Sequence, residues 1–156
     1  MADHWFRRMR RAVVLGSGVM GSQIAALFAA DGLEVDLLDV ASEGADPNAR
    51  AAAGLKETKG RKPPAFILPE HAERIHVGNF RNDLSRVKDA DWILEAVVEN
   101  PEVKRDLFAR VEELRKPGTI VSSNTSGISI RQLAEVEATI FGGRFWARIS
   151  LIHRAT

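Results

Sequence analysis

Three glycines at a fixed spacing offer the clearest chemistry in this chain. Gly16, Gly18 and Gly21 follow an apolar run and read G-x-G-x-x-G. The first glycine permits a tight turn, the second lets the backbone approach a diphosphate, and the third lets a helix pack closely on a strand. A helix that begins there presents free N–H groups and its positive dipole end to the anion. The spacing therefore predicts a dinucleotide-phosphate site.

A carboxylate further along the chain extends this prediction. Asp39 ends the next apolar run and follows Gly21 by 18 residues, close to where an acid commonly receives the hydroxyls of the adenosine ribose. An aspartate there favours NAD over NADP, because it would repel a 2′-phosphate. The alternative is an ordinary strand-turn-helix connection that binds no nucleotide.

Alternating strand and helix patterns would position these residues. We expect strands at 12–15, 34–39, 75–78, 91–98 and 119–123, and helices at 23–30, 48–59, 82–88 and 101–114. Several of the strands are almost wholly apolar, which is typical of a parallel sheet covered on both faces. The predicted fold class is α/β, a doubly wound parallel sheet (a Rossmann NAD-binding domain) that is incomplete at its C-terminal end.

Composition narrows the possible functions. The chain has 156 residues, of which 45% are hydrophobic, and a net charge of +1, which predicts one soluble domain and gives no reason to expect nucleic acid binding. No apolar stretch reaches the roughly 18 residues that span a bilayer. Because there is no cysteine, thiol chemistry and disulfides are excluded, and the four histidines show no metal-ligand spacing. We expect no metal, no membrane partner and a cytoplasmic location.

A second polar cluster follows two of the expected strands. Glu99 and Lys104 come after the 91–98 strand, and Ser126 comes after the 119–123 strand. Ligands of open α/β sheets bind beyond the carboxyl ends of the strands, so these side chains point toward the expected nicotinamide position. The alternative is that Glu99 and Lys104 form a solvated ion pair at a helix start and that the serines belong to a turn.

Taken together, these motifs resemble the N-terminal domain of the L-3-hydroxyacyl-CoA dehydrogenases. The resemblance runs in order from about Arg11 to about Leu133, and a weaker likeness around Pro63 is to the long bacterial members. It rests on Val-Leu-Gly-Ser-Gly-Val-Met-Gly, Leu-Leu-Asp39, Glu95-Ala-Val-Val-Glu-Asn100, Val-Lys104 and Ser-Ser-Asn-Thr-Ser126.

The resemblance implies an enzyme family with NAD as cofactor. Its members oxidise a 3-hydroxyacyl-CoA to a 3-ketoacyl-CoA in fatty acid β-oxidation, and the intact parent would be a homo-oligomer. Two alternatives stay open. One is another NAD-dependent β-hydroxyacid or sugar-acid dehydrogenase, and the other is a non-catalytic NAD-binding module.

The resemblance also implies which residues form the site. The cofactor contacts would be Gly16, Gly18, Val19, Met20, Gly21, Asp39, Ala96, Glu99 and Lys104. Ser126 would be the catalytic residue of this chain, hydrogen-bonding around the reacting oxygen. The general base of the family is a histidine in a His-Phe-Phe-Asn-Pro segment that this chain does not contain. His153 lacks those neighbours and is not assigned, so we expect catalysis by the chain as given to fail.

We expect three segments: a lead-in at 1–10, the Rossmann domain at 11–145 and an aberrant tail at 146–156. The tail can be written as a frameshift product. Deleting one base from codons for Leu-Gly-Thr-His-Phe-Phe-Asn-Pro-Pro-Arg-Tyr-Met yields Trp-Ala-Arg-Ile-Ser-Leu-Ile-His-Arg-Ala-Thr and a stop, which is the tail of this chain. The alternative is a genuinely divergent C-terminus.

Overall fold

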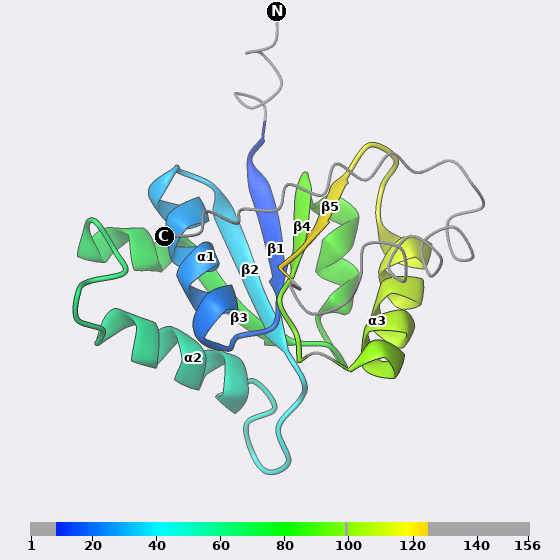
Figure 1. Cartoon of the computed structure of the whole chain (residues 1–156), viewed down its shortest axis with the longest axis horizontal. Helices are drawn as coiled ribbons and strands as arrows, with labels where there is room; N and C mark the ends of the chain where they lie inside the picture. The colour runs from blue at the N-terminus through cyan, green and yellow to red at the C-terminus, as the bar shows by residue number, and fades with distance from the viewer. Residues whose placement is uncertain (1–8, 99, 125–156) are drawn as a thin grey trace, which may run out of the picture.

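The computed structural model describes residues 9–98 and 100–124. Its centre is a parallel sheet of five strands in the order β3-β2-β1-β4-β5 (Figure 1). The strands are β1 (Arg11–Leu15), β2 (Glu34–Asp39), β3 (Ile75–Asn79), β4 (Trp92–Glu95) and β5 (Ile120–Ser123). This is the strand order of a doubly wound dinucleotide-binding fold, so the predicted fold class is confirmed.

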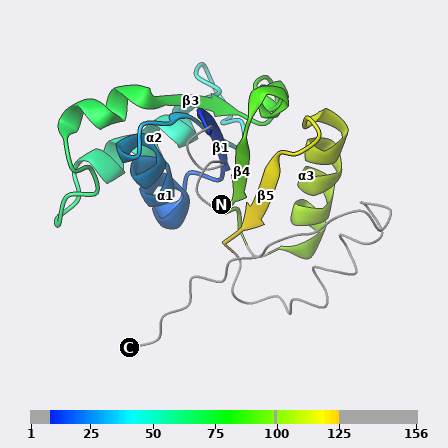
Figure 2. The ribbon, with the colours of Figure 1, turned by 90° about the horizontal axis from the view of Figure 1, so that it is seen from above.

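Helices connect the strands and cover both faces of the sheet (Figure 2). They are α1 (Val19–Ala30), α2 (Ala49–Lys59), the 3-10 helices η2 (Pro69–Arg74) and η3 (Leu84–Asp89), and α3 (Pro101–Leu114). The chain builds outward from β1 to β3 and then crosses back to β4, on the other side of β1. A crevice at such a switch point, beyond the carboxyl ends of β1 and β4, is the usual ligand site of this architecture.

Two apolar cores hold the layers together. Successive side chains of a strand point to opposite faces, and β1 follows this rule. Val13 and Leu15 pack in the core that contains Phe108 of α3, whereas Val14 packs in the core that contains Ala29 of α1. β1 is therefore buried from both sides, and the loop that follows it has a rigid base.

The start of α3 is set by two adjacent residues. Asn100 caps the helix, because its side-chain oxygen accepts hydrogen bonds from the backbone N–H groups of Glu102 and Val103, at 3.0 and 3.3 Å. Pro101 takes the first helical position, where its missing N–H costs nothing. The helix consequently begins at Pro101, six residues after the last residue of β4.

Three expected elements differ from the structure. The strand expected at 91–98 ends at Glu95, because the Val97 N–H donates to the Glu95 carboxylate, at 2.8 Å, instead of extending the ladder. The helix expected at 82–88 is the 3-10 helix η3. Helix α1 begins at Val19, four residues before the expected start, so the last glycine of the motif lies inside its first turn.

Within residues 9–98 and 100–124, no helix is long and apolar enough to cross a membrane. The expected lead-in lies almost wholly outside the described residues. The expected tail and the end of the expected 11–145 domain lie wholly outside them.

Candidate functional site

The turn after β1 depends on two glycines for its own packing. Gly16 has a φ of +107°, which side-chain-bearing residues rarely adopt, and a Cβ there would lie 2.5 Å from the Ala96 carbonyl oxygen. A Cβ on Gly21 would lie 1.9 Å from the Gly16 carbonyl oxygen. The turn, α1 and the segment after β4 therefore touch backbone to backbone.

Gly18 differs from its two neighbours in the motif. Its φ of −62° suits any residue, and a Cβ there would meet no atom of residues 9–98 and 100–124 within 4 Å beyond its own chain neighbours. Nothing in the described part of the chain requires glycine at this position, and within that part the space beside it is open. This is the arrangement expected where a ligand approaches the backbone closely.

The first turn of α1 offers hydrogen-bond donors toward that space. The first hydrogen bond within the helix runs from the Ser22 N–H to the Gly18 carbonyl, at 3.0 Å. The N–H groups of Val19, Met20 and Gly21 precede it and have no partner within the helix. Together with the helix dipole they form a site for an anion such as a diphosphate.

Asp39 lies against the same turn. One of its carboxylate oxygens accepts hydrogen bonds from both the backbone N–H and the hydroxyl of Ser17, each at 2.6 Å. The other accepts from the Val40 N–H, at 2.7 Å. A carboxylate accepts about four hydrogen bonds, so three protein donors leave capacity for a ribose hydroxyl.

Sequence reasoning missed Ser17 and the helix packed behind it. Ser17 is buried, its carbonyl accepts from the Ser22 hydroxyl at 2.8 Å, and its own hydroxyl also contacts the Arg50 carbonyl at 3.3 Å. A Cβ on Gly54 would lie 2.2 Å from the Ser17 carbonyl oxygen. The sequence signal was a glycine inside an alanine-rich helix, which marks a close approach.

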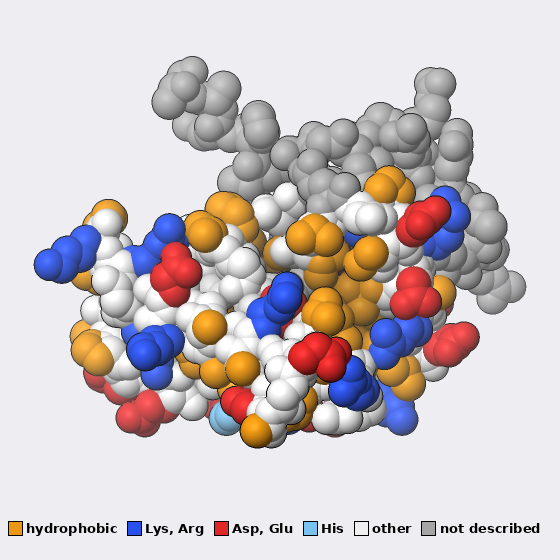
Figure 3. Space-filling model, turned by 90° about the horizontal axis from the view of Figure 1, so that it is seen from below, with side chains coloured by type: hydrophobic (Ala, Val, Ile, Leu, Met, Phe, Trp, Pro, Cys, Tyr) orange, Lys and Arg blue, Asp and Glu red, His pale blue; other side chains and the backbone are white. Residues whose placement is uncertain are grey.

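The other wall of the site follows β4. The Ala96 N–H donates to the Leu15 carbonyl, at 2.7 Å, and the Ala96 carbonyl lies over Gly16 as described above. Ala96 therefore lies against the glycine turn, and its expected contact with the cofactor stays a prediction. Figure 3 looks onto this edge of the sheet, where apolar side chains gather between charged ones. Exposed apolar residues follow three of the strands here: Val19, Met20, Val40 and Val98.

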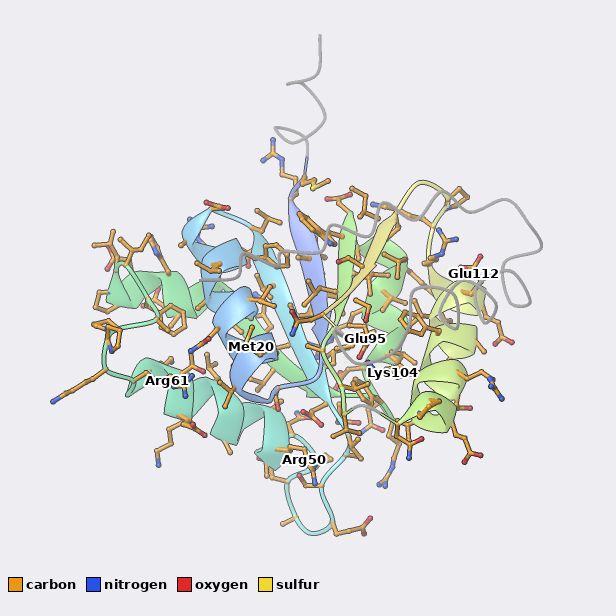
Figure 4. All side chains as sticks on the ribbon, viewed as in Figure 1. Met20, Arg50, Arg61, Glu95, Lys104 and Glu112 are labelled. Atoms are coloured by element: carbon orange, nitrogen blue, oxygen red, sulfur yellow. The ribbon has the colours of Figure 1, made fainter. Side chains whose placement is uncertain are left out.

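Lys104 is buried, not solvated. Its ammonium donates to both carboxylate oxygens of Glu95, at 2.8 and 3.0 Å, and the two side chains are only 3% and 0% exposed. Figure 4 shows the pair side by side between the end of β4 and α3. The alternative of a solvated pair at the helix start is therefore wrong for Lys104. Glu95 was not among the predicted site residues, although an acid at the end of an apolar strand is a usable signal.

Two predicted site residues, Glu99 and Ser126, lie outside the described residues. The strand that leads toward Ser126 is described to its end. There the Ser123 hydroxyl donates to Glu95, and the Asn124 N–H donates to the Glu95 carbonyl at 2.8 Å. The described part of this segment therefore ends beside the Glu95–Lys104 pair.

The described residues fit a bound dinucleotide. Open space beside Gly18, N–H groups without a helical partner at the start of α1 and an acceptor at Asp39 lie around one turn. Their donors and acceptors match a diphosphate and a ribose in that order.

Comparisons with known proteins agree with this geometry. The family described as "3-hydroxyacyl-CoA dehydrogenase, NAD binding domain" matches residues 11–145. A probable 3-hydroxyacyl-CoA dehydrogenase of Bacillus subtilis is 40% identical over 154 residues, covering 89% of this chain and 20% of the relative. One of Deinococcus radiodurans is 40% identical over 139 residues, covering 88% of this chain and 40% of the relative.

A solved structure gives the same result. The 3-hydroxybutyryl-CoA dehydrogenase of Escherichia coli matches with a TM-score of 0.63 and 32% identity, covering 81% of this chain and 27% of that one. The chain thus spans 20% to 40% of the length of the first curated relatives it matches.

Proposed function

This chain belongs to the 3-hydroxyacyl-CoA dehydrogenase family as an NAD-binding domain, and we propose that it holds NAD⁺ for the oxidation of a 3-hydroxyacyl-CoA to a 3-ketoacyl-CoA. The observation that carries the proposal is the open space beside Gly18, next to the donors of α1 and the acceptor of Asp39. Bound NAD⁺ would accept the hydride. The reaction is that of fatty acid β-oxidation.

Each residue of the candidate site has its own role in this proposal. The N–H groups of Val19, Met20 and Gly21 bind the diphosphate, and Asp39 receives the adenosine ribose. Ala96 lines the middle of the site. Glu99 and Lys104 lie toward the nicotinamide ribose, and Ser126 hydrogen-bonds around the reacting oxygen. The last three assignments rest on the family resemblance.

Cofactor binding is tested by calorimetric titration of the folded chain with NAD⁺. The expected result is saturable binding of one NAD⁺ per chain, and Gly18→Ala weakens it without unfolding the protein. A folded chain that takes up no NAD⁺ would overturn the proposal.

The reaction is tested in a chimera in which residues 11–145 replace the matched domain of the Deinococcus radiodurans relative. We expect NAD⁺ reduction with 3-hydroxybutyryl-CoA and none with free 3-hydroxybutyrate, with Ser126→Ala lowering the rate by about 100-fold. A chimera that binds NAD⁺ but prefers the free hydroxy acid would favour the alternative dehydrogenase class. Loss of NAD⁺ binding in the chimera would point to a failed graft, which the titration of the intact chain separates from a failed proposal.

A further inference from the structure

The Glu95 carboxylate joins three segments to the end of β4, at the carboxyl edge of the sheet. Glu95 is fully buried at the end of β4, paired in register with Leu15 of β1 and Ser123 of β5. Its oxygens accept from the Val97 N–H at 2.8 Å, from the Ser123 hydroxyl and from the Lys104 ammonium. One side chain therefore fixes the segment after β4, the end of β5 and the start of α3.

Lys104 needs this carboxylate because of where it lies. It belongs to the first turn of α3, near the positive end of the helix dipole, and is 3% exposed. A cation there loses hydration and meets an unfavourable field, so a paired carboxylate is needed to hold it in place. With Glu95 ionised, the pair is neutral overall.

The topology places this pair at the nicotinamide end of the site. Asp39 ends β2 on one side of β1, and the glycine turn follows β1 itself. With the adenosine ribose at Asp39 and the diphosphate at the turn, the remaining half of the dinucleotide extends toward β4 and β5. Glu95 ends β4, and Ala96 directly after it touches the turn at Gly16.

We propose that Glu95 is a positioning residue that holds Lys104 and cancels its charge, an inference that rests on the proposed function. Glu95 thereby sets the affinity for NAD⁺ relative to that for NADH. The nicotinamide ring carries a positive charge in NAD⁺ and none in NADH. A net charge next to the ring site therefore changes the affinity for NAD⁺ and leaves that for NADH nearly unchanged. A purely structural role would change both affinities by the same factor.

The test measures dissociation constants for NAD⁺ and for NADH at pH 7 in the full chain and three variants. Glu95→Gln removes one negative charge beside Lys104, and we expect NAD⁺ binding to weaken at least about fivefold more than NADH binding. Lys104→Met removes one positive charge beside Glu95 and should shift the ratio of the two dissociation constants in the opposite direction. The double variant Glu95→Gln/Lys104→Met is neutral again, so its ratio should return to within about twofold of wild type.

A matched control removes a different buried carboxylate. Asp36 in the middle of β2 is 3% exposed and accepts from Arg86 at 2.9 Å, away from the carboxyl edge. Asp36→Asn should lower stability while leaving the NAD⁺ to NADH ratio unchanged. If Glu95→Gln does not fold, the opposite shift in Lys104→Met and its return in the double variant still decide the question.

Three outcomes separate the inference from its premise. If the ratio of the NAD⁺ and NADH dissociation constants is unchanged in folded variants that bind both cofactors, the proposed function stands and the role of Glu95 is overturned. An equal shift in the Asp36→Asn control also overturns it, since general destabilisation would then account for the effect. Failure of the folded wild-type chain to bind either cofactor overturns the proposed function instead.

Discussion

Asp39 and Ser17 meet at a single carboxylate oxygen, which accepts both the backbone N–H and the hydroxyl of Ser17 at 2.6 Å. The contact ties the end of β2 to the glycine turn after β1. Asp39 thus has two effects, because it offers an acceptor to a ribose and also fixes the turn that faces the diphosphate.

Replacing Asp39 by alanine should weaken NAD⁺ binding at least about tenfold, because hydrogen bonds to a charged group contribute about 1.5–3 kcal/mol. Calorimetry measures the affinity. Ser17→Ala removes only the hydroxyl bond and should have a smaller effect. The control is Asp106→Ala on α3, whose side chain is 74% exposed. Equal affinity in Asp39→Ala and Asp106→Ala would contradict the assigned contact.

Alanine substitutions at two glycines of the same motif should have different effects, one on stability and the other on NAD⁺ affinity. In Gly21→Ala the new Cβ would lie 1.9 Å from a backbone oxygen, so we expect a loss of about 2 kcal/mol or more of unfolding free energy. In Gly18→Ala the new Cβ meets no described atom within 4 Å, so we expect stability to change by less than about 0.5 kcal/mol while NAD⁺ affinity falls.

Urea denaturation and calorimetry on both variants separate the two effects. Undiminished NAD⁺ binding by Gly18→Ala would show that the open space is not where the diphosphate lies.

Gly54→Ala should destabilise the protein although it lies inside a helix. Alanine normally stabilises a helix interior by up to about 1 kcal/mol relative to glycine. Here a Cβ would lie 2.2 Å from the Ser17 carbonyl oxygen, so we expect a net loss of about 1–3 kcal/mol in denaturation experiments and weaker NAD⁺ binding.

Gly60→Ala, at the end of the same helix, is the matched control because its Cβ would meet the nearest oxygen at an ordinary 3.6 Å. A stabilised Gly54→Ala protein would show that α2 does not press on the turn.

Part of the free energy of unfolding should depend on pH through the carboxyl group of Asp91. Burial raises the pKa of Asp91, but hydrogen bonds from Lys116 and from the N–H groups of Arg10 and Arg11 outweigh it and hold the pKa below its usual value. A carboxyl group whose pKa is lower in the folded than in the unfolded chain stabilises the fold above about pH 4. That contribution is lost as the pH falls through the lowered pKa.

Denaturation between pH 7 and pH 2.5 measures this contribution. Asp91→Asn should be less stable than wild type at pH 7, and the difference should narrow toward pH 2.5. A difference that stays constant with pH would mean that ionisation of Asp91 does not stabilise the fold.

Much of the fold was predictable because local pattern and topology agree. The short apolar run before the glycine turn predicts the buried strand β1, and the helix after Pro101 starts where the proline and the Asn100 cap place it. The short end of β4 was not predictable from pattern. Val97 is apolar and continues the run, but its N–H bonds to the Glu95 carboxylate, a contact that depends on the fold.

The parts of the candidate site that backbone geometry defines could be predicted from the sequence. The parts that depend on side-chain packing were harder to predict. The glycine spacing and Asp39 gave the turn and its acceptor. The burial of Lys104 could not be read from the sequence, since a lysine early in a helix is usually solvated. Gly54 acts through contact with Ser17, which lies far from it in sequence, and only the packed structure brings the two together.

The central claim, that the turn after β1 holds NAD, is tested most directly by titrating the folded chain with NAD⁺ and with NADP⁺ under the same conditions. The structure predicts one NAD⁺ per chain and at least about tenfold weaker NADP⁺, because the Asp39 carboxylate would repel a 2′-phosphate. A folded chain that binds neither nucleotide, or that prefers NADP⁺, would contradict it.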